Sequence, residues 1–249
     1  MPDHKVLLAG ESWRTVETHV KGFDMFQRGV YEEGADHLRE ALSKKDIEVE
    51  YLPCHEAGSD FPDTKESIEV YDAIILSDIG YSTLAIPPIT FDKFERRPNR
   101  LELIQEYVEE GGGFLMIGGY MSFQGIKGEG GYKKTPIEEI LPVSLEPFDD
   151  RVERSEGAVP EHTDPDHPIT SDLPAEWPHL LGYNRVTTDN EGKELLSINE
   201  DPLLVTGEYG KGRCAAFTSD CAPHWGSPAF TDWDHYPTLW ANLASWLSG

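Results

Sequence analysis

The chain has 249 residues, enough for one large α/β domain with a well-buried core, and we expect a single domain over residues 1–249. Its 46 acidic residues outnumber the 21 basic ones, which gives a formal net charge of −25 spread along the whole length. Nucleic acid and anionic membranes require a basic face, so we expect neither as a partner. Scattered acidity with few lysines resembles the composition of halophilic proteins.

The three cysteines indicate a reducing compartment. Cys54, Cys214 and Cys221 are odd in number and show no C-x-x-C spacing, which argues against a disulfide framework or a zinc knuckle. The first residues show no basic region followed by a long apolar run, and no stretch approaches membrane-spanning length. We therefore expect a cytoplasmic protein.

The N-terminal half predicts strands that alternate with helices. Val6 to Ala9 is a short apolar strand, and the loop after it carries Glu11, Ser12 and Trp13. Apolar residues at helical spacing within residues 31–44 predict an amphipathic helix. The other elements expected here are strands over residues 48–52 and 71–76, the second followed by Ser77 and Asp78, and a helix capped by Asn99.

The stretch from Glu109 to Gln124 has the pattern of a buried parallel strand. Three glycines precede the apolar run Phe114 to Ile117, and a second pair, Gly118 and Gly119, follows it. Ligands of open α/β sheets bind beyond the carboxyl ends of the strands. We therefore expect Tyr120, directly after the turn, to point at the site.

The second half is less regular at first. We expect a mobile glycine-rich loop over residues 125–131 and an irregular excursion over residues 145–178. A hairpin then follows with arms at residues 203–208 and 213–218, and an amphipathic helix closes the chain at residues 236–247. The whole pattern predicts an α/β fold of flavodoxin-like type. We expect a doubly wound, mostly parallel sheet with helices on both faces and a late antiparallel hairpin.

Unusual residues follow four of the predicted strands, where the strand ends should share one edge of the sheet. They are Gly10-Glu11-Ser12-Trp13, Ser77-Asp78-Ile79-Gly80, Gly118-Gly119-Tyr120, and Ser219-Asp220 with His224-Trp225. Together with T-P-I-E-E-I-L-P-V at 135–143 and F-T-S-D-C-A-P-H-W-G at 217–226, this layout resembles the class I glutamine amidotransferase-like superfamily. It is most similar to the putative glutamine amidotransferase family, near the ThuA-like proteins, and the resemblance spans nearly the full chain.

The resemblance implies a catalytic triad that this sequence does not carry. Working class I amidotransferases place a cysteine at the sharp turn after the central strand, and a histidine with a glutamate two residues on after a late strand. The thiolate attacks the amide, the imidazole activates the thiol, and the carboxylate orients the imidazole. Here the turn offers Tyr120 or Gly119, and Gly226 stands two residues after His224. We therefore expect no standard glutaminase activity.

The strand-end residues divide into two candidate sets. The catalytic candidates are His224, Asp220, Glu11 and Asp78. The substrate-binding candidates are Ser12, Trp13, Gly119, Tyr120 and Trp225. A strand-end aspartate commonly caps the next turn, and a loop histidine commonly bonds to backbone, but two acids at adjacent strand ends favour a site.

Two functions of different classes remain open from the sequence. One is a hydrolase or transferase that acts on a small polar substrate, and the other is a non-catalytic module that binds a carbohydrate-like ligand. A relocated thiol-imidazole dyad of Cys221 and His224 is an alternative, although a buried, inert cysteine is commoner.

We expect no resident cofactor. A divalent metal could draw on Glu11, His55, Asp78 and His224, but no H-E-x-x-H spacing supports it. The glycine-rich segments match neither the P-loop nor the G-x-G-x-x-G pattern of nucleotide sites. Trp225, Phe230 and Trp233 could form a contact in a homo-oligomer, and core packing explains them as well.

Overall fold

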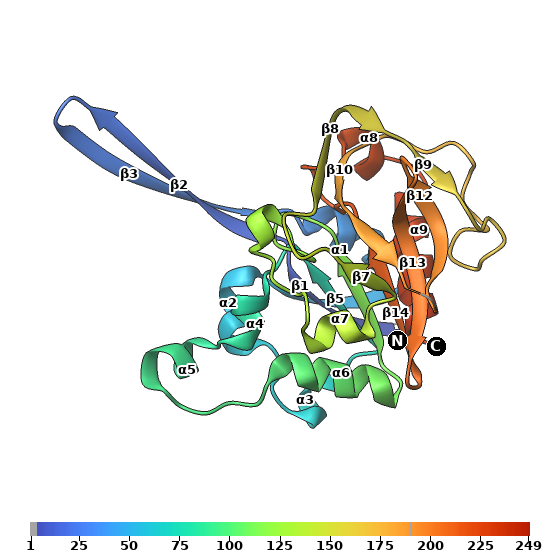
Figure 1. Cartoon of the computed structure of the whole chain (residues 1–249), viewed down its shortest axis with the longest axis horizontal. Coiled ribbons are helices and arrows are strands. Elements are labelled where there is room, and N and C mark those ends of the chain that lie inside the picture. Colours follow the sequence, from blue (N-terminus) through green and yellow to red (C-terminus); the bar gives the residue numbers. More distant parts are fainter. Residues whose placement is uncertain (1–3, 190) are drawn as a thin grey trace.

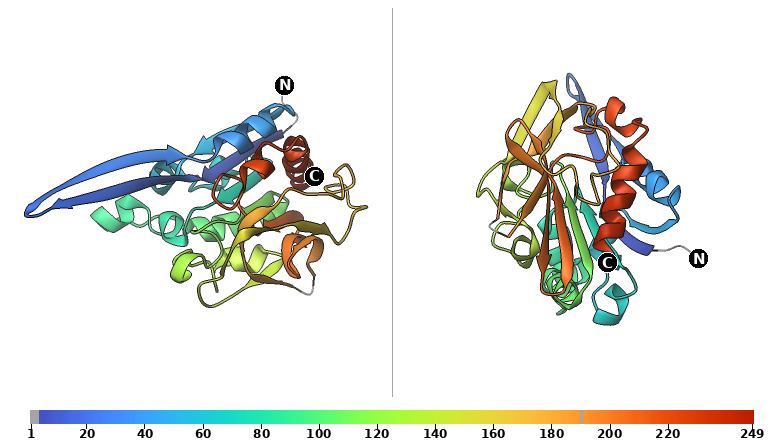
Figure 2. Two further views of the ribbon diagram at one scale, coloured as in Figure 1. Left: turned by 90° about the horizontal axis from the view of Figure 1, so that it is seen from above. Right: turned by 90° about the vertical axis from the view of Figure 1, so that its right-hand side faces the viewer.

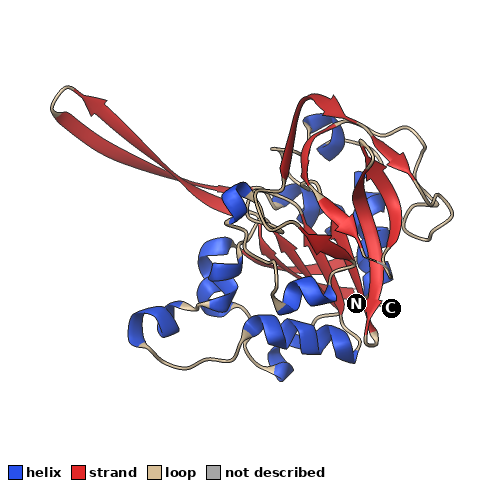
Figure 3. Cartoon of the chain, viewed as in Figure 1, coloured by secondary structure: helices blue, strands red, loops and turns tan. Residues whose placement is uncertain are grey.

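A computed structural model describes residues 4–189 and 191–249 of the chain. Its centre is an eight-stranded sheet in the order β4-β1-β5-β6-β14-β13-β12-β9, with helices on both sides (Figure 1; Figure 3). The parallel strands are β1 (His4–Gly10), β4 (Ile47–Leu52), β5 (Ala73–Ser77), β6 (Gly113–Ile117) and β14 (Gly212–Phe217). The antiparallel strands are β13 (Asp201–Tyr209), β12 (Lys193–Ile198) and β9 (Pro160–His162).

The parallel part of the sheet has the flavodoxin-like order. When the five parallel strands are numbered by their order in the chain, their order across the sheet is 2-1-3-4-5. The strands β5 and β6 read A-I-I-L-S and G-F-L-M-I and are buried throughout, as a strand covered on both faces requires. The predicted doubly wound sheet and the late hairpin of β13 and β14 are confirmed.

Helices cover the sheet on both faces and form two hydrophobic cores. On one face α1 (Asp36–Ser43) and α9 (Tyr236–Leu247) bury Leu38, Leu239 and Trp240 against the strands. On the other face α6 (Arg100–Glu110) buries Ile104 and Val108. The remaining helices are α2 (Cys54–Asp60), α3 (Lys65–Ile68), α4 (Tyr81–Ala85), α5 (Pro88–Lys93), α7 (Pro136–Ile140), α8 (Pro228–Thr231) and the 3₁₀ helix η1 (Ile126–Gly128).

Two predicted helix boundaries are confirmed in detail. The Asn99 side chain accepts a hydrogen bond from the Leu101 amide and so caps α6, and α9 covers the predicted residues. Among the described residues, no helix combines the length and apolar character needed to cross a membrane.

The segment after β1 differs from its prediction. Instead of a loop and an early helix, β2 (Ser12–Lys21) and β3 (Asp24–Glu33) form a long antiparallel hairpin that projects from the body (Figures 1 and 2). The helix begins only at Asp36. The β-branched residues Thr15, Val16 and Thr18 favour a strand, but both strands are largely exposed and lack the alternation of a half-buried strand.

The predicted irregular excursion is also wrong, because strands run through it. β8 (Arg151–Ala158) pairs with β10 (Leu180–Asn184), β7 (Val143–Leu145) pairs with β11 (Val186–Thr188), and β9 extends the central sheet. The glycine-rich loop before them is anchored where it begins. The buried Asp150 carboxylate accepts hydrogen bonds from the amides of Gln124 and Gly125, each at 2.9 Å.

Candidate functional site

The carboxyl ends of β1, β5, β6 and β14 meet at one edge of the sheet, as their parallel pairing requires. Side chains that follow these strands line a cavity of about 450 Å³. The lining residues are Glu11, Trp13, Asp78, Tyr120, Met121, Ile126, Asp220, Pro223 and His224. The cavity therefore contains all four residues predicted to be catalytic, together with Trp13 and Tyr120.

The turns at this edge require tight backbone packing. A Cβ on Gly10 would lie 1.9 Å from the Ser77 carbonyl oxygen, and one on Gly118 would lie 2.2 Å from that of Thr218. The next residues after β1 and β5, Glu11 and Asp78, have φ angles of 47° and 44°. Left-handed backbone is uncommon for residues other than glycine, and such strain is concentrated at functional sites.

Glu11 lines the cavity and is almost completely buried. Its Oε2 accepts a hydrogen bond from the Ser77 hydroxyl at 2.5 Å and a weaker one from the Cys221 thiol at 3.8 Å. Burial raises the pKa of the Glu11 carboxyl well above its ordinary value, and the neighbouring acids Asp220 and Asp78 raise it further. The site therefore favours the protonated, uncharged form of Glu11.

Asp220, which is buried, and Asp78, which is partly buried, both line the cavity and accept hydrogen bonds from backbone amides. The Asp78 Oδ1 accepts from the Met121 amide at 2.6 Å, and the Asp220 Oδ1 accepts from the Ala222 amide at 2.9 Å. Burial raises the pKa of both carboxyls, and the charge of Asp78 adds to the rise for Asp220. The floor thus contains three carboxyl groups whose pKa values are all raised by burial.

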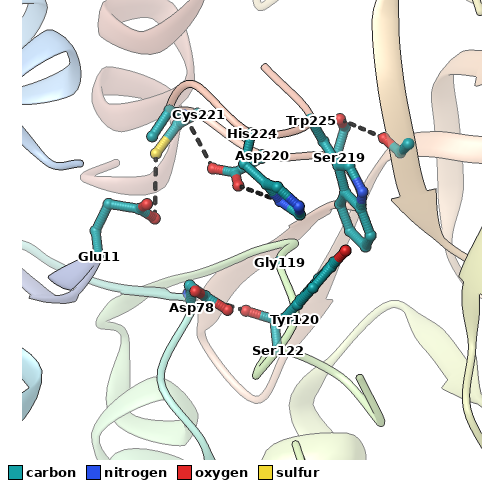
Figure 4. Close-up of polar contacts among 12 residues, drawn as sticks. Glu11, Asp78, Gly119, Tyr120, Ser122, Ser219, Asp220, Cys221, His224 and Trp225 are labelled. Carbon is teal, nitrogen blue, oxygen red and sulfur yellow. Dashed lines mark hydrogen bonds and ion pairs between the residues drawn. The ribbon is translucent and has the colours of Figure 1, made fainter. Parts of the chain in front are cut away.

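His224 lies above this floor with its ring toward the cavity (Figure 4). Its Nδ1 lies 3.8 Å from Oδ2 of Asp220, and 42% of the side chain is exposed. The Tyr120 ring stands edge-on to the imidazole, with centroids 4.3 Å apart, and the Trp225 ring stacks against it at 5.5 Å. His224 therefore has a carboxyl group behind it and aromatic rings at its sides.

Glu153 belongs to this cluster, although it was not among the residues predicted from the sequence. Its two carboxylate oxygens accept hydrogen bonds from the Tyr120 hydroxyl at 2.9 Å and from the Trp225 indole nitrogen at 3.0 Å. Glu153 lies on β8, in the segment predicted to be irregular. No local pattern marked it, because the charged residues of R-V-E-R-S-E do not alternate with uncharged ones.

Three of the predicted substrate-binding residues do not line the cavity. The Ser12 hydroxyl accepts a hydrogen bond from the Cys54 amide at 2.8 Å, and the Gly119 amide donates to the Asn184 side chain at 3.0 Å. Trp225 is buried behind Tyr120. Ser12, Gly119 and Trp225 therefore lie behind the residues that line the cavity.

The structure does not gather the predicted set of metal ligands. His55 packs its ring edge-on against Tyr31, with centroids 4.9 Å apart, and does not line the cavity. Within the described ranges, the metal-ligand types that do cluster are Glu11, Asp220 and Cys221, with donor atoms within 4.8 Å of one another. Burial favours the protonated form of all three, and protonated groups are poor ligands.

The alternative thiol-imidazole dyad is not formed. The Cys221 thiol points toward Glu11 and lies 3.5 Å from the Ser77 hydroxyl, whereas His224 turns toward Tyr120 (Figure 4). Burial raises the pKa of the Cys221 thiol well above its ordinary value, and Glu11 and Asp220 raise it further. Cys221 is therefore a buried, protonated thiol.

Similar proteins share the whole architecture. The cytoplasmic protein STM3548 of Salmonella typhimurium is 44% identical, with a TM-score of 0.94 over 97% of this chain and 98% of its own. The cytoplasmic protein STM1381 of Salmonella typhimurium LT2 is 47% identical, with a TM-score of 0.94 over 98% and 99%. A ThuA-like protein from Parabacteroides merdae shares the fold at 14% identity, with a TM-score of 0.61 over 98% of this chain and 90% of its own.

No curated protein matches the chain. The sequence profile of one family, described as "Putative glutamine amidotransferase", matches residues 5–249. That match covers the sheet, the cavity and every candidate residue discussed above. The chain therefore belongs to the putative glutamine amidotransferase family.

Proposed function

We propose that the cavity is the active centre of an enzyme that moves a proton on a small polar substrate, in a hydrolysis or transfer reaction. The observation that carries this proposal is the position of His224, which faces the cavity with Asp220 behind it at 3.8 Å. An imidazole with a carboxyl group on one side and open space on the other suits general acid–base catalysis. Protonation of the imidazole would favour the ionised form of Asp220, because opposite charges attract strongly in a buried site.

The composition of the lining favours an uncharged or cationic substrate. Three acids line the cavity and none of its nine lining residues is Lys or Arg, so an anion would meet no compensating charge. A protonated carboxyl group both donates and accepts hydrogen bonds, so it can bind the hydroxyl groups of a substrate, which also donate and accept. Trp13 and Tyr120 add flat aromatic surfaces of the kind that pack on sugar rings, so we propose a carbohydrate-like substrate.

Hydrolysis of glutamine through a thioester does not fit this centre. The nucleophile position carries Tyr120, whose hydroxyl is bonded to Glu153, and Cys221 is buried against Glu11. We propose that the chain releases no ammonia from L-glutamine by that route. Release that disappears in Cys221→Ser would overturn this part of the proposal.

The acid–base role can be tested before the natural substrate is known. We would screen p-nitrophenyl esters and p-nitrophenyl glycosides, then compare His224→Ala and Asp220→Asn with His179→Ala, an exposed histidine outside the cavity. His224→Ala should lower kcat/KM by at least about 100-fold, the usual contribution of a general base, while His179→Ala changes it little. An equal rate in wild type and His224→Ala would refute the assignment.

A binding module is the second candidate, and one observation favours it. The Tyr120 hydroxyl and the Trp225 indole are both already bonded to Glu153, which makes a rigid aromatic wall instead of a set of reactive groups. In that case sugars should raise the Tm of the protein, Trp13→Ala should abolish the rise, and no substrate should be turned over. Turnover that depends on His224 would exclude this candidate.

We also propose that the protein works in the cytoplasm. The two Salmonella relatives are named as cytoplasmic proteins, and they are 44% and 47% identical to this chain. Three cysteines without a disulfide among them fit a reducing compartment. Fractionation of the source cells with an antibody against the chain would test this directly.

A further inference from the structure

The first residues of β8 lie behind the aromatic side of the cavity and contact Tyr120 directly. Arg151 and Glu153 are two residues apart on this strand, so their side chains leave the same face of it. The Tyr120 hydroxyl donates a hydrogen bond to Glu153 at 2.9 Å, and the Arg151 guanidinium lies over the Tyr120 ring, 4.8 Å from its centre. Tyr120 is therefore held both at its hydroxyl and at one face of its ring.

Arg151 is itself fixed by a neighbouring acid. Asp149, just before the strand, accepts hydrogen bonds from Nε of Arg151 at 2.9 Å and from its Nη2 at 2.8 Å. A bond to two nitrogens of one guanidinium fixes its plane. Nη1 of Arg151 also lies 3.6 Å from Oε1 of Glu153. We call residues 149, 151 and 153 the charged network.

Trp225 reaches Glu153 through a gap left by a glycine. Gly182 on β10 pairs with Glu153 on β8. A Cβ on Gly182 would lie 2.3 Å from Nε1 of Trp225, so the indole lies where a side chain would otherwise be. In this position the indole nitrogen donates a hydrogen bond to Glu153 at 3.0 Å. The missing side chain at position 182 is therefore what allows this hydrogen bond.

The two rings bonded to Glu153 form a corner in which the imidazole of His224 lies. The ring centroids of Tyr120 and Trp225 are 5.6 Å apart, and the imidazole centroid lies 4.3 Å from the first and 5.5 Å from the second (Figure 4). We call the rings of Tyr120 and Trp225 the aromatic corner. Oδ2 of Asp220 lies 3.8 Å from Nδ1 of His224, too far for a normal hydrogen bond, which leaves the two rings to orient the imidazole.

We propose that Glu153 is a positioning residue, which holds the aromatic corner and through it sets the orientation of the His224 imidazole. A carboxylate suits this role because its two oxygens accept hydrogen bonds from two donors at once. The catalytic part of the role rests on the proposed function of His224, whereas the orientation of the ring does not. Trp225 and Phe230, two of the aromatic residues considered for a subunit contact, are buried in the core instead.

The effect on His224 can be separated from an effect on folding. Because 52% of the Glu153 side chain is exposed, its substitution should leave the fold intact. Far-UV circular dichroism and the Tm of each variant check this expectation. A change at His224 in a folded variant then reports the position of the ring.

Nuclear magnetic resonance of protein with ¹³C-labelled histidine tests the proposal without a substrate. The chain has 9 histidines, and the signals of His224 are those that disappear in His224→Ala. Nearby aromatic rings displace the signals of ring protons, so the wild-type His224 signals should differ from those of the exposed His179. Glu153→Ala should free the two rings to move and shift the His224 signals toward those of His179.

The conservative variant Glu153→Gln separates position from charge. Its amide oxygen can accept from the Trp225 indole, and its amide nitrogen can donate to the Tyr120 hydroxyl. The His224 signals should therefore stay as in wild type. Signals of His224 that do not move in Glu153→Ala would overturn the proposal, and so would a shift in Glu153→Gln as large as that in Glu153→Ala.

Two further variants test the route through Trp225. Gly182→Ala should push the indole away from Glu153 and displace the His224 signals, although the substitution is on a different strand. Glu156→Ala is the matched control, because Glu156 is exposed on the same strand and lies outside the charged network. A shift in Glu156→Ala equal to that in Glu153→Ala would show a general effect of β8 and would overturn the specific role.

Turnover gives a second measurement and distinguishes this proposal from the proposed function. On a substrate whose turnover requires His224, Glu153→Ala should lower kcat by up to about 100-fold, as misplacement of a reacting group by about 1 Å does. Glu153→Gln should restore the rate. Equal kcat in wild type and Glu153→Ala would overturn the catalytic part of the role while His224 keeps its own. If no substrate requires His224, the proposed function fails, and the resonance comparison still decides whether Glu153 orients the ring.

Discussion

A carboxyl oxygen of Glu11 and one of Asp220 lie within 4.8 Å of each other, and both side chains are buried. Two carboxylates at that distance in a low-dielectric site repel each other, so at least one keeps its proton. Burial raises the pKa of each group, and Asp78 raises it further. The cavity floor is therefore a source of protons and hydrogen-bond donors, which a set of ionised carboxylates would not be.

This pair predicts a stability that falls as pH rises. A carboxyl whose pKa is raised in the folded state binds more protons there than in the unfolded chain, so its contribution is complete below the unfolded pKa and is lost as pH rises through the folded pKa. For Glu11 this loss begins above the ordinary value of 4.5. Glu11→Gln cannot ionise, so it should become more stable relative to wild type as the pH is raised from about 5 through neutrality.

Thermal unfolding of both proteins across this range measures the effect. Glu106→Gln serves as the control, because Glu106 is exposed on α6 and its substitution should leave the pH dependence unchanged. A Tm difference between Glu11→Gln and wild type that stays constant with pH would contradict the protonation of Glu11.

The thiols should be almost unreactive in the folded protein. Burial raises the pKa of Cys54 to about 11 and that of Cys214 to about 12, and it raises the pKa of Cys221 well above its ordinary value. Since the thiolate is the reactive form, an aromatic disulfide reagent at neutral pH should modify native Cys221 at least about 100-fold more slowly than the unfolded chain. Peptide mapping identifies the modified residue, and rapid modification of native Cys221 would revive the thiol mechanism.

The turn that positions Tyr120 should not tolerate a side chain at Gly118. A Cβ there would lie 2.2 Å from the Thr218 carbonyl and 2.6 Å from its carbon, both parts of the rigid sheet edge. Gly118→Ala should lower the free energy of unfolding by about 3 kcal/mol or more. Gly22→Ala is the comparison, because Gly22 lies at the tip of the hairpin of β2 and β3 and a Cβ there would meet nothing within 4 Å. The loss of stability is then limited to the strain of an alanine at a φ of +65°, about 1–2 kcal/mol. Equal costs measured by urea unfolding would show that the turn can relax.

The sequence predicted the parts of the fold that are buried and periodic. The run Phe114 to Ile117 could only be a strand covered on both faces, and the glycines after it located the turn that carries Tyr120. The same logic placed Glu11, Asp78 and His224 at one edge, because parallel strands bring their carboxyl ends together. The hairpin of β2 and β3 could not be predicted in this way, because a two-stranded ribbon without a core has no buried face, and its sequence therefore shows no alternation of apolar and polar residues.

Glu153 is a site residue that could not be predicted from the sequence. Its role depends on β8 crossing behind Tyr120, a long-range pairing with β10 that no local pattern encodes. The neutral state of Glu11 has the same origin. A glutamate in a loop is ordinarily charged, but burial beneath Gly34, where a Cβ would lie 2.6 Å from Glu11 Oε1, raises the pKa of Glu11, and the neighbouring Asp220 and Asp78 raise it further.

The acidic surface predicts that salt stabilises the protein. At a formal net charge of −25, repulsion among exposed carboxylates opposes folding, and salt screens it over distances beyond about 3 Å at 1 M. The Tm should rise by at least about 5 °C from dilute buffer to molar KCl, which corresponds to roughly 2 kcal/mol for a chain of this size. A variant with Glu102→Gln, Glu106→Gln and Glu109→Gln on the exposed side of α6 carries less negative charge and should respond less to KCl. If the Tm is equal in dilute buffer and molar KCl, or if the two proteins respond alike, charge repulsion does not limit stability.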